Sequence, residues 1–396
     1  MADFATLALS RGADRRLRTG HSWIYANEFG GKLAHYGLAP GALISVRSIA
    51  GEDLGWASFN PNALIAARLF GLSSDRAFDQ NFIVTRLRQA QQLRVELGKA
   101  EFGRQVHSEG DGLPGVILDR YGPVMVGQLG TWFWELRRAE LSAAISQVFG
   151  VNTLIWKNDG SSRSLEGLPA EVLCEAGIEP SHVSVVEDAL TLQAPLRSGQ
   201  KTGWFYDQTD NRSRLAPRMR GKRVLDLYCY LGGWGLRAAQ AGAAEVLCVD
   251  ASEPALAQLR ANAESNSLAQ VRTERADVFD FLKRMHAQGQ RFDFVVVDPP
   301  AFAKRKKDLE QGALAYRRVF ELALRVVAPG GFMVACSCSH HYDRAALNDG
   351  VARAAARLNL RVKVLAELAQ GADHPVHPAM PETAYLKGAL LQVLGH

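Results

Sequence analysis

The order of apolar and polar positions divides the chain into three regions with different predicted structure. Residues 1 to about 75 carry short apolar stretches separated by Gly, Pro and Asn turns, among them "SWIYANEF", "GALISVRS" and "ALIAARLFG". This spacing predicts a small mixed-β barrel. From Asn81 to Gly98 apolar residues recur at helical spacing, and two strand patterns follow, "GVILDRYGPVMVGQL" and "NTLIWKND". We therefore expect a central α+β module.

After the segment "PLRSGQKTGWFYDQTDNR" the pattern changes to strands that alternate with helices. Such alternation predicts a parallel, doubly wound α/β sheet. Strands are expected at Val224–Tyr228 and Val246–Val249, and further on in "FDFVVV" and "GGFMVACSCS". Sheets of this kind bind ligands at the carboxyl ends of their strands, so the residues that follow each strand are the candidate site.

The first two of these strands end in residues suited to a nucleoside cofactor. The turn "YCYLGGWG" contains Gly232 and Gly233, and Asp250 stands at the tip of the second strand, where it can accept both hydroxyls of a ribose. A nicotinamide dehydrogenase needs G-x-G-x-x-G, which this turn lacks. Asp226, just before the turn, suits a cationic amino-acid group better than a diphosphate. The pattern favours S-adenosylmethionine over NAD.

Two further acids follow the next strands. Asp277, in "RTERADVFDFL", is placed to meet the adenine amino group. "FDFVVVDPPAFAK" ends a strand in Asp298 and two prolines, which fix a rigid turn, with Phe302 beyond it. We expect Asp298 and Phe302 to face the substrate; the alternative is that "DPP" only stops the strand.

Cys336 and Cys338 lie one residue apart at the end of an apolar run, so their side chains share a face of the strand. Their spacing does not match a zinc site, despite His340 and His341, and we expect no metal. A buried cysteine usually behaves as a small hydrophobe, which suits Cys336, Cys229 and Cys248. Cys338 is followed by polar residues, and we predict that it is a nucleophile.

The composition indicates in which compartment the protein is expected and which kinds of partner it can bind. Of 396 residues, 47% are hydrophobic and 22% charged, and no apolar run approaches the ~20 residues that span a bilayer. The first residues lack the order of a secretory signal, and an odd number of cysteines, five, forms no disulfide framework. We expect a cytoplasmic protein without a membrane partner. A net charge of +5 permits a polyanionic partner, and the basic runs 212–223 and 304–307 are either solvated faces or contacts with one.

These motifs together resemble the bacterial large-subunit (23S) ribosomal RNA cytosine carbon-5 methyltransferases that have an N-terminal PUA domain. The resemblance covers nearly the whole chain, in the segments "GHSWIYANEF", "SEGDGLPGVILDRYG", "KTGWFYDQTDNR", "LDLYCYLGGWG", "DPPAFAK", "SCS" and "GADHPVHPAMPETAYLKG". It implies a PUA-like RNA-binding domain over residues 1–75, a central α+β module over 76–190 and a Rossmann-like class I methyltransferase domain over 191–396. Ribosomal RNA is the implied partner, and self-association into a homodimer is left open.

The resemblance implies roles for individual residues. Cys338 would add to carbon 6 of the cytosine while Asp298 holds the ring nitrogen and amino group. Sources of positive charge for the thiolate are Lys304, Arg305 or His340. Relatives often have a second cysteine after the paired prolines, where this chain has Ala301, so a water, Asp298 or another residue must take the carbon-5 proton. The expected cofactor contacts are Asp226, Tyr228, Gly232, Gly233, Asp250, Asp277 and Gln208.

Substrate contacts are expected in two places. Phe302, Tyr206 or Phe205 could stack on the base, with Lys304 nearby, and Arg15 and Arg16 could bind RNA or form a solvated turn. Single residues near the C-terminus, namely Asp373, His374 and Lys387, are expected to be structural. Two other functions remain open: methylation of a purine nitrogen, which needs no thiol, and a non-catalytic RNA-binding protein.

Overall fold

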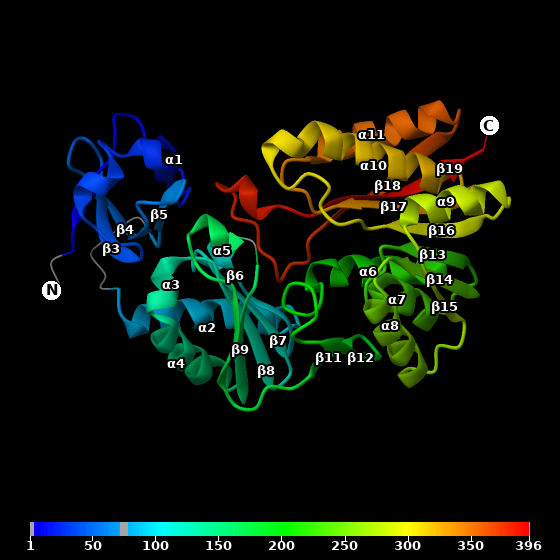
Figure 1. Ribbon diagram of the computed structural model, residues 1–396, viewed down its shortest axis with the longest axis horizontal. Helices are drawn as coiled ribbons and strands as arrows, with labels where there is room; N and C mark the ends of the chain where they lie inside the picture. Colours follow the sequence, from blue (N-terminus) through cyan, green and yellow to red (C-terminus); the bar gives the residue numbers. More distant parts are fainter. Residues whose placement is uncertain (1–3, 72–77, 161, 396) are drawn as a thin grey trace. The chain divides into compact units, whose positions relative to one another are not determined.

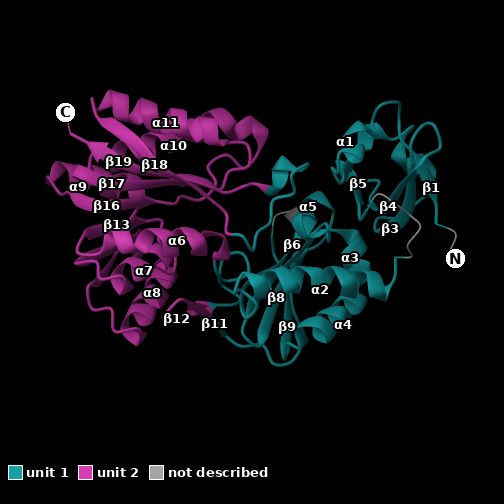
Figure 2. Cartoon of the chain, turned by 180° about the vertical axis from the view of Figure 1, so that it is seen from behind, with its two compact units in different colours: residues 1–184, 195–204, 372–383 teal, residues 185–194, 205–371, 384–396 magenta. Residues whose placement is uncertain are grey.

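The computed structural model describes residues 4–71, 78–160 and 162–395, and the chain forms two compact units (Figure 2). Unit 1 comprises residues 1–184, 195–204 and 372–383, and unit 2 comprises residues 185–194, 205–371 and 384–396. Both units are therefore built from segments that are far apart in the sequence. The finer division of the chain at residues 75 and 190 stays a prediction.

The N-terminal part of unit 1 is a five-stranded sheet with the strand order β1-β3-β4-β5-β2. Its strands are β1 (Thr6–Ala8), β2 (Trp23–Tyr25), β3 (Ala42–Arg47), β4 (Asp53–Phe59) and β5 (Ile65–Leu69), with short helices α1 (Arg15–Arg18), η1 (Ala26–Glu28) and η2 (Leu33–Tyr36) between them. Only β1 and β3 pair in parallel. A bridge between Leu9 and Phe29 joins the segments that follow the two edge strands, so the sheet curls toward closure.

A second five-stranded sheet, in the order β10-β9-β8-β7-β6, forms the rest of unit 1. The strands are β6 (Phe102–His107), β7 (Val116–Tyr121), β8 (Val124–Leu129), β9 (Thr153–Asn158) and β10 (Glu171–Ala176), and the helices are α2 (Gln80–Glu96), η3 (Ser108–Asp111), α3 (Trp132–Leu136), α4 (Arg138–Phe149) and α5 (Ser162–Leu165). Helix α2 confirms the helix predicted from Asn81 to Gly98, and it begins where Asp79 accepts a hydrogen bond from the backbone N–H of Phe82. Trp134 and Trp156 are fully buried in the core of this sheet.

Unit 2 contains a seven-stranded sheet in the order β15-β14-β13-β16-β17-β19-β18. The strands are β13 (Arg223–Leu227), β14 (Glu245–Asp250), β15 (Val271–Arg275), β16 (Phe292–Val297), β17 (Val327–Ser337), β18 (Arg361–Ala369) and β19 (Lys387–Leu394). The first five run parallel, as the alternation of strands and helices predicted. Strand β19 is antiparallel to both of its neighbours, so the sheet is mixed at this edge rather than wholly parallel.

Helices cover both faces of this sheet (Figure 1). Helices α9, α10 and α11 pack on one face, where they share a core cluster with strand residues such as Leu225 and Val295, and α7 and α8 lie on the other. The helices of unit 2 are α6 (Thr209–Leu215), α7 (Gly233–Gln240), α8 (Glu253–Ser265), α9 (Val278–Ala287), α10 (Leu309–Leu324) and α11 (Arg344–Arg357), with η4 (Tyr206–Gln208), η5 (Ala216–Met219) and η6 (Lys306–Asp308). A small two-stranded sheet of β11 (His182–Glu187) and β12 (Leu190–Pro195) and the turn η7 (Pro381–Thr383) lie where the chain passes between the units in sequence.

Candidate active site

The carboxyl ends of four neighbouring strands of unit 2 meet at one edge of the sheet. Leu227 at the end of β13 pairs with Val249 on one side and with Val297 on the other, and Val297 pairs with Ala335 of β17. The residues that follow these positions are therefore neighbours in space. This register brings Asp226, Asp250, Asp298 and the two cysteines to the same edge.

Asp226 is fully buried beneath the turn that follows β13. Its Oδ2 atom accepts a hydrogen bond of 2.8 Å from the N–H of Gly235, while Oδ1 has no partner among the described residues. Burial raises the pKa of this carboxyl to about 8; the charges of the nearby Asp298 and Asp250 act in the same direction, and the hydrogen bond from Gly235 opposes them. A buried acid with an unpartnered oxygen fits an ammonium group such as that of S-adenosylmethionine, and the contact itself stays a prediction.

The turn itself is held in an uncommon backbone conformation. Tyr228 has φ 60°, Tyr230 has φ 50° and Gly232 has φ 83°. Left-handed conformations in large residues cost free energy and are concentrated at ligand sites. The hydroxyl of Tyr228 is buried without a partner among the described residues, and burial raises its pKa. No local sequence pattern predicts that two tyrosines adopt this conformation.

The glycines of the turn are required by neighbouring protein atoms. A Cβ atom on Gly235 would lie 2.3 Å from Sγ of Cys248, and one on Gly232 would lie 2.7 Å from Leu259. A Cβ atom on Gly233 would lie 3.1 Å from the guanidinium of Arg212. Cys248 lies in β14, so Gly235 lets α7 pack closely on the sheet, whereas Gly232 lies close to α8 and Gly233 close to α6. The expected approach of the cofactor to the backbone at Gly232 and Gly233 stays a prediction.

The other two acids expected at the cofactor already accept hydrogen bonds. Asp250 is half-buried and accepts from the N–H groups of Tyr230 (3.0 Å) and Ser252 (2.9 Å), so it fixes the turn. Asp277 is exposed and caps α9 by accepting from two N–H groups of its first turn, at 2.9 and 3.1 Å. An acid just before a helical pattern is a common helix N-cap, so the sequence around Asp277 contains the signal for this cap. The cap was not among our predictions.

Asp298, directly after β16, is held by two donors. Its Oδ2 atom accepts from Nε2 of Gln208 (2.9 Å) and from Nε1 of Trp234 (3.1 Å). The amide oxygen of Gln208 in turn accepts from Asn211 (2.7 Å). Gln208 is buried and held by Asn211, so its hydrogen bond positions Asp298. The sequence did not predict this role, and the expected contact of Gln208 with the cofactor stays a prediction. Trp234 had not been singled out either.

The loop after Asp298 is tied to the segment that carries Cys338. The ring of Phe302 lies 4.8 Å from that of Tyr316, and the Tyr316 hydroxyl is 2.8 Å from Oγ of Ser339. The same Oγ atom accepts a hydrogen bond from the N–H of Ala303 (3.1 Å). Phe302 is thus half-buried in an aromatic cluster, and Lys304, further along the loop, is exposed.

Cys336, rather than Cys338, lies level with Asp298. Ala335 pairs with Val297, so the next residue of each strand is Cys336 and Asp298. Cys336 is buried, and burial together with the charge of Asp298 raises its pKa well above the ordinary value. Cys338 lies just beyond the end of β17 and is half-buried. Cys229 and Cys248 are buried too, which confirms the structural reading of all three inner cysteines.

Lys387 is a further residue near the candidate site that the sequence did not point to. The sequence predicts only a structural residue here, but Lys387 is buried, pairs with Ser337 of β17 and donates a hydrogen bond of 2.5 Å from Nζ to the carbonyl of Ser339. Burial lowers its pKa to about 8, while the charges of Cys338 and Asp343 oppose that change. The ammonium group therefore lies close to Cys338 from a strand near the end of the chain, a proximity that only the pairing of β17 with β19 creates.

Arg15 and Arg16 lie in α1 of unit 1, and the other candidate residues lie in unit 2. Arg15 is exposed, whereas Arg16 forms a bidentate ion pair with Glu28 at 2.8 and 2.9 Å. Arg212, in the first basic run, is buried in a bidentate pair with Glu187 at 2.7 Å, so it does not belong to a solvated face.

Within residues 4–71, 78–160 and 162–395, no group of three or more His, Cys, Asp or Glu side chains could hold a metal ion. In the same part of the chain, no helix has the length and apolar composition needed to cross a membrane.

The strand order of unit 2, the turn after β13 and the acid at the end of β14 define a class I S-adenosylmethionine-dependent methyltransferase. The family model for S-adenosylmethionine-dependent methyltransferases matches residues 168–391, and a model for PUA-like domains matches residues 7–71. The chain belongs to the S-adenosylmethionine-dependent methyltransferase family. Its cofactor is S-adenosylmethionine, which confirms the preference over NAD.

Relatives match over nearly their whole length. The proteins named ribosomal RNA large subunit methyltransferase I from Photobacterium profundum and Erwinia tasmaniensis are each 33% identical to this chain, and the alignments cover 97–98% of this chain and 98–99% of the relatives. A methyltransferase of known structure from Streptococcus mutans has the same fold, with a TM-score of 0.83 at 20% identity over 98% of this chain and 100% of that one. A further structure, of a methyltransferase complexed with SAH, matches with a TM-score of 0.85 at 21% identity and the same coverage.

Proposed function

We propose that this protein methylates carbon 5 of a cytosine in large-subunit ribosomal RNA, with Cys338 as the nucleophile. Relatives that match over nearly the whole chain are named for methylation of large-subunit ribosomal RNA, which supports the substrate class. The observation that carries the reaction type is a half-buried cysteine at the carboxyl edge of the sheet, with Lys387 close to it. Methylation of a purine nitrogen would need no thiol there.

The chemistry follows from the low reactivity of carbon 5 toward an electrophile. The thiolate of Cys338 forms a bond to carbon 6, and the electron pair of the ring double bond moves to make carbon 5 nucleophilic. A proton shared between the carboxyl of Asp298 and the ring nitrogen neutralises the added charge, and the same carboxyl accepts a hydrogen bond from the amino group, so that the adduct is stabilised. S-adenosylmethionine, when bound, supplies the methyl group to carbon 5. Loss of the carbon-5 proton to a base then restores the double bond and expels the thiolate.

The hydrogen bonds and charges around Asp298 and Cys338 suit these two residues to their proposed roles. Gln208 and Trp234 both donate to one oxygen of Asp298 and fix its orientation, so the carboxylate is positioned before the base arrives. Lys387 supplies the positive charge that favours the thiolate form of Cys338. Lys304, Arg305 and His340, which the sequence suggested for this task, are exposed, so water screens their charges more strongly.

The test is methyl transfer from labelled S-adenosylmethionine to unmodified large-subunit ribosomal RNA, followed by mass analysis of the nucleosides. We expect 5-methylcytidine from the wild type, none from Cys338→Ala, and continued turnover by Cys336→Ala, the matched control two residues earlier in the chain. A methylated purine formed equally by Cys338→Ala would overturn the carbon-5 mechanism and leave the fold and cofactor unchanged.

A further inference from the structure

A cavity of about 200 Å³ lies within unit 1, apart from the methyltransferase sheet. Its wall includes Trp23 of β2, Glu109 of η3 and Asn158 at the end of β9, together with Thr131 and Arg163. Both sheets of unit 1 therefore contribute to it. None of these residues has a role in the function proposed above.

Three side chains of this wall have a buried polar atom without a partner among the described residues. The atoms are Oγ1 of Thr131, Nδ2 of Asn158 and Nη2 of Arg163. The three residues are only 2%, 1% and 3% exposed. Buried polar groups are nearly always hydrogen-bonded, so three unpartnered ones around a single cavity indicate a ligand with hydrogen-bond acceptors.

The remaining atoms of these side chains are fixed, so the free donors have defined positions. Oδ1 of Asn158 accepts a hydrogen bond of 2.7 Å from the N–H of Leu129. Arg163 donates from Nε to the carbonyl of Pro169 and from Nη1 to that of Leu129, both at 2.8 Å. A ligand would therefore meet donors that lose little freedom on binding.

The charges of the wall favour a neutral ligand over a phosphate. Each cation that lines the cavity already has a carboxylate partner: Arg163 pairs with Glu135 at 2.9 Å, Arg68 with Glu166 at 2.5 Å, and Lys157 with Asp159 at 2.5 Å. The carboxylate of Glu109 also faces the cavity. Because no uncompensated positive charge remains in this set, an anion would be desolvated without a counter-charge.

We propose that this cavity binds one unpaired nucleobase that bears a carbonyl acceptor, a pyrimidine or guanine rather than adenine, from single-stranded RNA. The volume is below the range of about 300–1,000 Å³ for whole small-molecule ligands and suits a single planar ring system. Single-stranded RNA is recognised by hydrogen bonds to the edges of extruded bases and by contact with aromatic side chains, and Trp23 is such a residue in the wall. The inference rests on the RNA substrate proposed above.

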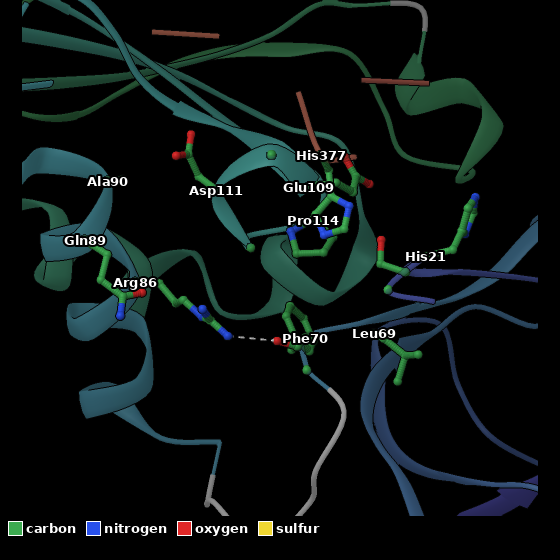
Figure 3. A pocket seen from close by; sticks show the side chains of 15 residues that line it. His21, Leu69, Phe70, Arg86, Gln89, Ala90, Glu109, Asp111, Pro114 and His377 are labelled. Atoms are coloured by element: carbon green, nitrogen blue, oxygen red, sulfur yellow. Dashed lines mark hydrogen bonds between the residues drawn. The ribbon is translucent and has the colours of Figure 1, made fainter. Parts of the chain in front are cut away.

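A larger cavity of about 440 Å³ in unit 1 shares Glu109 with this one (Figure 3), and none of the described side chains that line it has a buried polar atom without a partner. Arg86 donates to the carbonyl of Phe70 at 3.2 Å, as Figure 3 shows. Asp111 accepts from both terminal nitrogens of the Arg94 guanidinium. The smaller cavity, whose wall has three unpartnered atoms, is therefore the candidate ligand site.

The test compares binding of hexauridylate and hexaadenylate to the full-length protein without cofactor. We expect the wild type to prefer hexauridylate, and Thr131→Val, which is nearly isosteric, to lower that affinity about 3- to 10-fold with hexaadenylate unchanged. Asn158→Asp should act in the same direction, since it keeps the acceptor for Leu129 and removes the donor. Thr191→Val, at an exposed position of β12, is the matched control and should have no effect.

Equal affinities for the two oligonucleotides in the wild type, unchanged in both variants, would show that the cavity holds only water and would overturn the proposal. Thermal unfolding of each variant without RNA separates a folding defect from a binding defect, and Thr131→Val is the variant that keeps the shape of the side chain. Failure of methyl transfer with the uridylate preference intact would remove the proposed reaction and leave this site standing.

Discussion

At the level of single residues, the proposed reaction depends on Cys338 and Lys387. The two are brought together by the antiparallel pairing of β17 with β19, and Nζ of Lys387 is anchored on the carbonyl next to the cysteine. A buried ammonium close to a thiol stabilises the thiolate, because the low local dielectric strengthens their attraction. The reactivity of Cys338 is therefore expected to depend on Lys387 even when neither RNA nor cofactor is present.

Replacing Lys387 by Met should shift the pH dependence of Cys338 alkylation by iodoacetamide to higher pH and lower its rate at pH 7 about tenfold. The rate is measured by mass analysis of the Cys338 peptide. Lys387→Arg should retain most of the reactivity because it keeps the charge. Since the pKa of Lys387 is about 8, its effect should fade above that pH. An identical profile in wild type and Lys387→Met would remove the lysine from the mechanism.

Asp226 should make the stability of the cofactor-free protein fall with rising pH. Its pKa is about 8 in the folded protein and about 4 when unfolded, so between these values the folded state binds the extra proton. The free energy of unfolding therefore declines from about pH 4 to pH 8. Asp226→Asn should flatten that slope in denaturant titrations and weaken S-adenosylmethionine binding at least tenfold. A slope that persists in Asp226→Asn would assign it to other groups.

At the level of elements, the sequence predicted those helices and strands that a local pattern of apolar and polar residues determines. Strand β13, helix α2 and the end of β16 follow from apolar periodicity and from Asp298 with its prolines. What it could not predict depends on pairing between distant segments: the insertion of β19 beside β17, the level of Cys336 with Asp298, and the burial of Lys387. The helix cap at Asp277 could have been predicted from the sequence, because an acid precedes the helical pattern there, but it was not among our predictions.

The close approach of helix α7 to the sheet gives a test at the same level. Gly235→Ala should destabilise unit 2 by about 1–3 kcal/mol, because the new methyl group would overlap Sγ of Cys248. Adding Cys248→Ala should recover part of that loss, as measured by chemical denaturation. Gly30→Ala is the control, because a Cβ atom at Gly30 would lie 3.7 Å from its nearest neighbour, the carbonyl oxygen of Ala8. If the double variant were as unstable as the sum of the two single ones, the overlap would not be the cause.

For the whole molecule, the important feature is that residues 372–383 belong to unit 1. Asp373 is fully buried there, and its carboxylate accepts from Lys99 (3.1 Å), from the N–H of Arg104 (3.1 Å) and from His374 (3.0 Å). Its backbone carbonyl accepts from the buried Arg94 at 2.7 Å. These partners hold the pKa of Asp373 below its ordinary value despite burial.

Asp373→Ala should therefore destabilise unit 1 by about 3–5 kcal/mol, since it leaves buried partners uncompensated. Because the pKa of Asp373 is lowered on folding, its contribution is present above about pH 4 and is lost as the pH falls. Hydrogen exchange resolved along the chain is the measurement, with S-adenosylmethionine affinity as the control that should not change. Equal loss of protection in both units would contradict an effect local to unit 1.

The same segment sets the order in which the protein can be completed during its synthesis. The arginines and the lysine that surround Asp373 leave the ribosome early, whereas Asp373 follows after six strands of the seven-stranded sheet have been made. Unit 1 therefore obtains its last partners only near the end of synthesis, shortly before residues 384–396 complete unit 2. A chain that is cut short before residue 372 leaves this polar cluster open, so an incomplete product differs from a finished one in its N-terminal half as well as at its end.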